Sequence, residues 1–348
     1  MKKRDILNLI KYHIENDDYS FREQAYNIAS DFNGSGDEEL GLYVMSLLSD
    51  KNTFVPQTMN GQSNYIKLLD TGNSHIELPD AIMDDIKGIM NAISYNAGIN
   101  KFLFEGAPGT GKTECAKHIA RILNRQLYSV DFDGLIDSKL GQTAKNIASL
   151  FEEINNLNYP EQVIILFDEI DSLAMDRIDS RDLREMGRAT SAVLKGFDNL
   201  NGDVVIIATT NLFDKFDKAL IRRFDKVVDF GRYSREDLLG IAECITDDLL
   251  KRFTFAGRNM RLLKKLISLM EPIPYPGDLT NLIKTSLAFS DCNYEFDYFS
   301  CMLKQIRPEL LSKPKDLKDF GFTLREIESL TRIPRSTLSR DFQVLKNE

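Results

Sequence analysis

Apolar and polar residues follow three different patterns along the chain. In the first fifty residues, apolar side chains recur at helical spacing, as at Ile6, Ile10 and Ile14, which predicts three short amphipathic helices. This block carries five basic and ten acidic side chains, so we expect an acidic helical module over residues 1–50. Residues 51–75 show little periodicity and are rich in Asn, Gln, Ser and Thr, which predicts a linker.

From residue 76 onward, short apolar runs alternate with helical stretches. Strands whose residues are nearly all apolar are buried on both faces, which is typical of a parallel sheet covered by helices. We therefore predict an α/β domain over residues 76–233 with a five-stranded parallel sheet, its strands at residues 101–104, 127–130, 163–167, 204–208 and 226–230. The pattern then becomes helical, which predicts a small helical domain over 234–304 and a separate tail over 305–348.

Composition and charge narrow the functional classes. A length of 348 residues favours two or three domains. The net charge of −9 disfavours a protein whose whole surface coats nucleic acid, although it permits a local basic patch. No apolar run approaches the ~20 residues of a transmembrane helix. The cysteines have no CxxC spacing, which predicts neither a disulfide framework nor a zinc site, and we expect reduced thiols in the cytoplasm.

The strongest chemical signal follows the first apolar strand of the predicted sheet. The segment matches G-x-x-x-x-G-K-[ST] and precedes a predicted helix; its residues are Gly106, Ala107, Pro108, Gly109, Thr110, Gly111, Lys112 and Thr113. Glycines allow backbone N–H groups to turn inward around phosphates at the positive end of a helix. We expect Lys112 to neutralise the β- and γ-phosphates of ATP and the Thr113 hydroxyl to ligate Mg²⁺.

Polar residues end two of the later strands. Asp168 and Glu169 come directly after the strand at 163–167, at the sheet edge where α/β proteins bind ligands. We expect Asp168 on the metal side and Glu169 as the general base for the attacking water. Asn211 follows the next strand and could position that water, and Arg222 and Arg223 end a predicted helix.

In their order along the chain, GAPGTGKT, VIILFDEID, IIATTN and ALIRRFD resemble the AAA+ ATPases, in particular the AAA clade of katanin, spastin and the AAA proteases. The resemblance covers about residues 76–300. It implies an ATP- and Mg²⁺-binding α/β domain followed by a helical lid, working as a ring that is usually a hexamer. It further implies that Asn211 is the first sensor and that Arg222 and Arg223 are arginine fingers for the neighbouring subunit. Arg188 falls where the clade often has another interface arginine.

One segment departs from the pattern of the AAA clade, and another departs from other branches of the family. The clade's pore loop carries an aromatic residue before an apolar residue and a glycine, and here Lys139, Leu140 and Gly141 occupy those places. A basic pore loop indicates a more acidic or nucleic-acid client, and an ordinary exposed lysine is the alternative. The segment 276–281 has no arginine where many other branches carry a second sensor, which suits the AAA clade.

The tail carries a different signal. Thr323 with Glu326 forms a capping box that predicts a helix start, and a second helix opens after a turn. The pair resembles a helix-turn-helix, in which the residues placed to contact DNA are Arg335, Ser336, Thr337 and Arg340. Residues 313–348 carry eight basic and six acidic side chains, which is little charge for binding duplex DNA alone. Protein docking therefore remains an alternative to DNA binding.

Our leading hypothesis is an ATP-driven ring motor that remodels or delivers a macromolecular client, with residues 1–50 as an adaptor. The arrangement also resembles bacterial AAA ATPases encoded beside a subtilisin-like serine protease in plasmid-incompatibility and anti-phage systems. The chain has no HExxH motif, so any proteolysis would come from a partner protein. The alternatives are an ATPase that loads on DNA through the tail, as a replication, partition or transposition helper, and a nucleotide-dependent scaffold.

Overall fold

The structure of the chain is a computed structural model. It describes residues 3–14, 24–25, 27–28, 32, 65–72, 78–135, 142–173, 182–215 and 217–344. The first predicted N-terminal helix is confirmed as α1 (Lys3–Ile14). Most of the other two predicted N-terminal helices, and of the predicted linker, lies outside the described residues.

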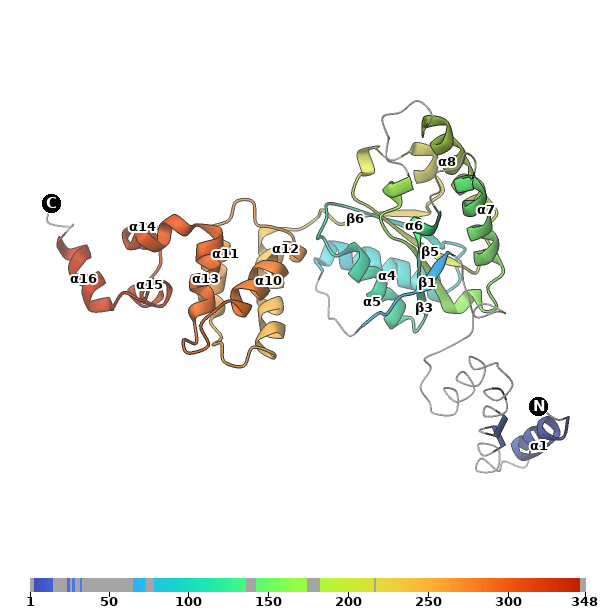
Figure 1. The fold of residues 1–348 in the computed structure, drawn as a ribbon, viewed down its shortest axis with the longest axis horizontal. Coiled ribbons are helices and arrows are strands. Elements are labelled where there is room, and N and C mark those ends of the chain that lie inside the picture. The colour runs from blue at the N-terminus through green and yellow to red at the C-terminus, as the bar shows by residue number, and fades with distance from the viewer. Residues whose placement is uncertain are drawn as a thin grey trace.

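One mixed sheet forms the centre of the α/β domain (Figure 1). Its strand order is β1-β3-β4-β5-β2-β6. The strands are β1 (Ile66–Leu68), β2 (Lys101–Glu105), β3 (Gln126–Val130), β4 (Val163–Phe167), β5 (Val205–Thr210) and β6 (Lys226–Asp229). All neighbours pair in parallel except β1, which runs antiparallel to β3 at the sheet edge. The five predicted parallel strands are confirmed.

Strand β1 corrects the sequence prediction in two respects: the sheet has six strands, and residues 66–68 belong to it instead of to a linker. The strand pairs along one side only, and of its residues only Ile66 is buried. A single buried side chain leaves no alternation for a sequence pattern to show, and short exposed strands of this kind are common at sheet edges.

Helices cover both faces of the sheet. The helices of the α/β domain are α4 (Asp80–Ser94), α5 (Lys112–Ile122), α6 (Phe132–Leu135), α7 (Gln142–Asn155), α8 (Asp182–Asp198) and α9 (Lys218–Ile221), with 3₁₀ turns η1 (Pro160–Gln162), η2 (Ile170–Leu173) and η3 (Phe213–Lys215). Successive strand residues point to opposite faces. Ile164 therefore packs with α4 and α5, whereas Ile165 packs with α7 and α8.

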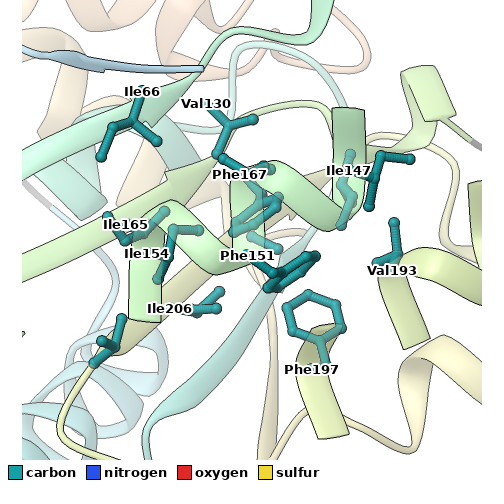
Figure 2. Close-up of a cluster of buried hydrophobic side chains, with 14 of the residues drawn as sticks. Ile66, Val130, Ile147, Phe151, Ile154, Ile165, Phe167, Val193, Phe197 and Ile206 are labelled. Atoms are coloured by element: carbon teal, nitrogen blue, oxygen red, sulfur yellow. The ribbon is translucent and has the colours of Figure 1, made fainter. Parts of the chain in front are cut away.

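Aromatic rings fill the core beneath α7 and α8 (Figure 2). The ring centroids of Phe151 and Phe197 lie 5.5 Å apart in an edge-to-face arrangement. The ring of Phe167, at the end of β4, stacks 6.0 Å from Phe151. A Cβ at Gly196 would lie 2.1 Å from the Phe151 ring, so this close packing of α8 on α7 requires glycine. The carboxyl end of β4 is therefore fixed by packing immediately before Asp168.

After β6 the described residues form helices and no further strands. The helices are α10 (Arg235–Leu250), α11 (Met260–Ile267), α12 (Pro276–Ala288), α13 (Asp297–Ile306), η4 (Pro308–Ser312), α14 (Pro314–Asp319), α15 (Leu324–Thr331) and α16 (Arg335–Val344). They extend away from the sheet, with α16 at the far end (Figure 1). The capping box at Thr323 and Glu326 is confirmed at the start of α15.

The tail packs onto the helical domain through a single hydrophobic cluster. Buried residues of the tail, such as Ile327 and Leu330, belong to the same cluster as α11 and α13. Lys265 of α11 forms an ion pair with Glu326 at 2.8 Å, and Arg332 pairs with Asp297 of α13 at 2.6 Å. Residues 234–344 therefore share one core.

Candidate functional site

The glycine-rich segment forms the loop between β2 and α5. Gly109 and Gly111 have φ of 78° and 90°, values that side chains with a Cβ rarely adopt. A Cβ at Gly106 would lie 3.1 Å from Cβ of Phe230, so the loop also passes close to the end of β6. Helix α5 begins at Lys112 directly after the loop, which places the loop at the positive end of the helix dipole. The predicted strand–loop–helix context is confirmed.

Lys112 is 6% exposed and reaches across the loop. Its Nζ donates hydrogen bonds to the carbonyl oxygens of Gly106 at 2.6 Å and Ala107 at 2.9 Å, and to Oδ1 of Asn211 at 2.7 Å. Burial lowers the pKa of the ammonium group, and the nearby carboxylates, Asp168 first among them, oppose this shift. The lysine is thus held by neutral oxygens beside a group of acidic side chains.

The carboxylate of Asp168 is hydrogen-bonded by two hydroxyl groups. Thr113 Oγ1 donates to Oδ1 of Asp168 at 2.8 Å, and Thr209 Oγ1 donates to the same oxygen at 2.7 Å. Thr113 and Asp168 offer a hydroxyl and a carboxylate, which are the oxygen ligands that Mg²⁺ prefers. Thr113 and Asp168 would hold Mg²⁺ together with oxygens of a bound triphosphate. By themselves, the described residues contain no group of three or more His, Cys, Asp or Glu that could hold a metal.

Glu169 lies next to Asn211. The Nδ2 of Asn211 donates to Oε1 of Glu169 at 3.3 Å, while Oδ1 of the same amide accepts from Lys112. Glu169 has φ of 53°, which is uncommon for a residue with a side chain. The backbone N–H of Glu169 donates to Thr209 Oγ1 at 2.8 Å. The structure thus brings together four residues singled out in the sequence: Lys112, Asp168, Glu169 and Asn211.

The helical domain forms the other wall of a cavity of about 960 Å³ above the loop. Tyr233 donates a hydrogen bond from its hydroxyl to the carbonyl of Thr110 at 2.7 Å, and the Gly277 N–H donates to the carbonyl of Gly109 at 2.8 Å. Helices α10 and α12 and the turn that follows α10 line this wall. The lining residues are Ile241, Ile245, Asp248, Leu249, Lys251, Arg252, Pro276, Gly277 and Thr280. These contacts could not be predicted from sequence patterns, because they join segments more than a hundred residues apart.

The structure keeps the two predicted finger arginines away from this cavity. Arg222 is exposed, and Arg223 forms a two-point ion pair with Asp198 of α8, with both N–O distances at 3.0 Å. Neither is among the described residues that line the cavity. Arg188 is exposed on α8. The pore-loop residues Lys139, Leu140 and Gly141 lie outside the described residues.

In the tail, the four residues predicted to contact DNA differ in whether their side chains already have a partner within the chain. Ser336, Thr337 and Arg340 are exposed on α16. Arg335 is also exposed, but it forms an ion pair with Glu328 of α15, with its Nε 2.7 Å from Oε2. None of the helices that the structure describes has the length and apolar composition of a membrane-spanning segment.

Comparisons with known proteins agree with this geometry. Residues 102–232 match the family model "ATPase family associated with various cellular activities (AAA)". The chain is 41% identical over 133 residues to "Uncharacterized AAA family ATPase y4kL" of Sinorhizobium fredii, covering 38% of this chain and 39% of that protein. It is 32% identical over 199 residues to the proteasome-activating nucleotidase of Methanococcus vannielii, covering 50% and 48% of the two chains.

The chain is also 32% identical over 199 residues to the peroxisomal ATPase PEX6 of Candida glabrata, covering 51% of this chain and 19% of that protein. The chain thus spans less than half the length of each of these relatives. A solved structure described as "Structure of E. coli MS115-1 HORMA:CdnC:Trip13 complex" shares the fold, with a TM-score of 0.54 at 18% identity over 66% of this chain and 87% of that one. Residues 102–232 therefore match an ATPase domain of the AAA family, a kind of domain that binds ATP together with Mg²⁺.

Proposed function

We propose that this protein hydrolyses ATP at the cavity between the glycine-rich loop and the helical lid. The observation that carries the proposal is the hydrogen-bonded group formed by Lys112, Asn211 and Glu169 beside Asp168. When bound, Mg²⁺ supplies positive charge that offsets the charge developing on the transferred phosphoryl group. Thr113 and Asp168 would hold this ion, and Lys112 would exchange its carbonyl partners for phosphate oxygens.

Glu169 is the proposed general base for the attacking water. A carboxylate can accept the water's proton, and the Asn211 amide is placed to orient either the carboxylate or the water. Lys112→Ala tests the nucleotide site itself. We expect loss of ATP binding, measured by titration with a fluorescent ATP analogue, because the variant lacks the charge that faces the triphosphate. Unchanged affinity in the folded variant would contradict the site.

We further propose that Arg222 and Arg223 act on the ATP of a neighbouring subunit in a ring, most simply a hexamer. Arginine fingers contribute ~10³–10⁵ in rate in related phosphoryl-transfer systems. Both arginines lie outside their own chain's cavity, which supports a role in trans. An Arg223→Ala chain should bind ATP and fail to hydrolyse it. Mixed with Lys112→Ala chains, it should regain turnover; rings shown to be mixed that remain inactive would argue for a role in cis.

The work of this motor is proposed to be the remodelling or delivery of a macromolecular client in the cytoplasm. The hydrogen bond from Gly277 to the loop supports this, because it links the lid directly to the nucleotide site. Residues 1–50 would act as adaptor and Lys139 would face the client. We propose that the motor acts with a separate protein, such as a serine protease in a bacterial antiviral defence system.

A Glu169→Gln chain tests this role, because a ring arrested with ATP should hold its client. Mass spectrometry of the proteins retained by that variant, with Lys112→Ala as the matched control, should identify a partner specific to the ATP-bound state. Identical sets of proteins on both variants would contradict the remodelling proposal.

A second candidate function is the binding of duplex DNA through the tail. Helix α16 favours it, because Ser336, Thr337 and Arg340 are exposed while Leu338 of the same helix is buried in the shared core. A filter-binding titration at two salt concentrations tests it. Arg340→Ala should lower the salt slope by ~1 if Arg340 contacts a phosphate, whereas Lys87→Ala on α4 should not. No measurable affinity at ~50 mM salt would exclude duplex binding.

A further inference from the structure

We propose that Thr209 is a positioning residue that fixes both carboxylates of the site, Asp168 and Glu169, through one hydroxyl group. The inference rests on the proposed ATP hydrolysis and adds to it a role for Thr209, a residue of the IIATTN segment to which the sequence pattern assigns no function. Thr209 is 1% exposed and lies in β5, next to the strand that ends at Asp168. It belongs to the cavity lining together with Asp168, Glu169 and Asn211.

The hydroxyl of Thr209 acts both as a hydrogen-bond donor and as a hydrogen-bond acceptor. A threonine hydroxyl has one hydrogen to donate and lone pairs that accept. Here it donates to Oδ1 of Asp168 at 2.7 Å and accepts the backbone N–H of Glu169 at 2.8 Å. A single side chain therefore orients the carboxylate of one residue and the peptide group of the next.

The backbone holds Thr209 firmly in place for this task. β5 pairs in parallel with β4 on one side, up to Phe167 and Ala208, and with β2 on the other, where Thr209 is the partner of Phe104. Every residue of β5 is buried, so the position of Oγ1 follows from the sheet register. A positioning group works when its own geometry is fixed in this way.

The bond to Asp168 matters most when a metal ion is present. Thr113 also donates to Oδ1 of Asp168, but the Thr113 hydroxyl is itself a proposed ligand of Mg²⁺. If the Thr113 hydroxyl coordinates the ion, the Thr209 hydroxyl is the one that continues to orient Asp168. Hydrogen-bond partners behind a metal ligand typically change metal affinity or activity by 10–100-fold when removed.

The bond to Glu169 stabilises an unusual backbone conformation. Glu169 has φ of 53°, in the left-handed region that residues with a side chain rarely occupy. Its N–H is held by Thr209, and its side chain then meets the Asn211 amide at 3.3 Å. Without the Thr209 hydroxyl, the peptide can turn toward a more common conformation and carry the carboxylate away from its position beside Asn211.

Substitutions at position 209 test this role. Thr209→Val keeps the shape and removes the hydroxyl, and we expect kcat to fall by about 10–100-fold with a small change in KM. Thr209→Ser keeps the hydroxyl and should retain most of the activity. Thr209→Ala differs from Thr209→Ser only by the hydroxyl, so this pair gives the same comparison if the valine variant does not fold.

A second readout does not depend on turnover. The affinity for a fluorescent ATP analogue is measured with and without Mg²⁺ for each variant. Affinity without Mg²⁺ should match the parent, while the gain in affinity on adding Mg²⁺ should shrink for Thr209→Val and Thr209→Ala and persist for Thr209→Ser. Thr246→Val is the matched control, since it removes a buried hydroxyl that bonds only within α10, to the carbonyl of Ala242.

Two results would overturn the inference. One is parental kcat and a parental Mg²⁺ effect in a folded variant that lacks the hydroxyl. The other is a Thr209→Ser variant as defective as Thr209→Ala, because packing and not the hydroxyl would then be responsible. A parent protein that binds ATP without hydrolysing it would refute the proposed function instead, and the Mg²⁺ effect on affinity would still decide the role of Thr209.

Discussion

The contact between Gly277 and Gly109 predicts that a single methyl group can separate the lid from the nucleotide loop. Gly277 is the second residue of α12, and its N–H donates to the carbonyl of Gly109 at 2.8 Å. A Cβ on Gly277 would lie 2.8 Å from the Cα of Gly109, a distance that Cβ atoms essentially never show. Both partners are backbone, so neither can rotate away. In Gly277→Ala the lid must therefore move.

The cost follows from two contributions. Forcing a methyl group into a well-packed contact costs about 1–3 kcal/mol, and a lost hydrogen bond about 0.5–1.5 kcal/mol. Alanine at a helical position returns about 0.5–1 kcal/mol relative to glycine. The closed arrangement should thus lose about 0.5–4 kcal/mol. Because ~1.4 kcal/mol corresponds to tenfold in affinity, ATP should bind roughly two- to several hundredfold more weakly.

The assay is titration with a fluorescent ATP analogue, with Gly240→Ala as the matched control. Gly240 lies in α10 of the same lid, and a Cβ there meets nothing within 4 Å, so this variant gains helix propensity without the clash. Thermal unfolding of both variants shows that the fold is intact. If Gly277→Ala binds the nucleotide as tightly as Gly240→Ala, the lid contact does not contribute to binding and the reasoning is wrong.

Two further predictions concern the core that lid and tail share. Leu330→Ala should lower the free energy of unfolding by about 2–5 kcal/mol, because this fully buried side chain lies between tail and lid. Chemical denaturation measures the change. A loss below ~0.5 kcal/mol, as at a surface site, would show that the tail and the lid are independent of each other. Burial raises the pKa of Glu326, but hydrogen bonds from Lys265 and Thr323 outweigh it and hold the pKa below the ordinary value of 4.5. The resulting stability is present above pH 4.5 and is lost as the pH falls through the folded-state pKa. Glu326→Gln should therefore narrow the difference in melting temperature between neutral and acidic pH, and an unchanged difference would count against the ion pair.

The sequence predicted those features that depend on neighbours along the chain. The apolar run at 163–167 predicted a buried strand, and the spacing of glycines around Lys112 predicted the phosphate loop, because both are local patterns. The meeting of Glu169 with Asn211 was also predictable, since parallel strands end at the same sheet edge.

Other features depend on side chains that meet only after folding. Thr209 stands one residue beyond Ala208 in an apolar strand, and nothing in that run distinguishes its hydroxyl from that of any buried threonine. Two other contacts, Arg223 with Asp198 and Gly277 with Gly109, likewise join segments that are distant in sequence. The edge strand at 66–68 is too short to show the alternation of apolar and polar residues that predicts a strand. Such contacts arise from packing and register, which a pattern of residue types does not contain.

The central claim is that Glu169 activates water for ATP hydrolysis at this site, and Glu169→Gln tests it most directly. The glutamine side chain has nearly the same shape, but its amide cannot accept the proton of the attacking water. Phosphate release and binding of the fluorescent ATP analogue should be measured on the parent and on the variant, each with Mg²⁺. We predict that the variant binds ATP as tightly as the parent and releases no phosphate; hydrolysis by the variant at the parental rate would contradict the claim.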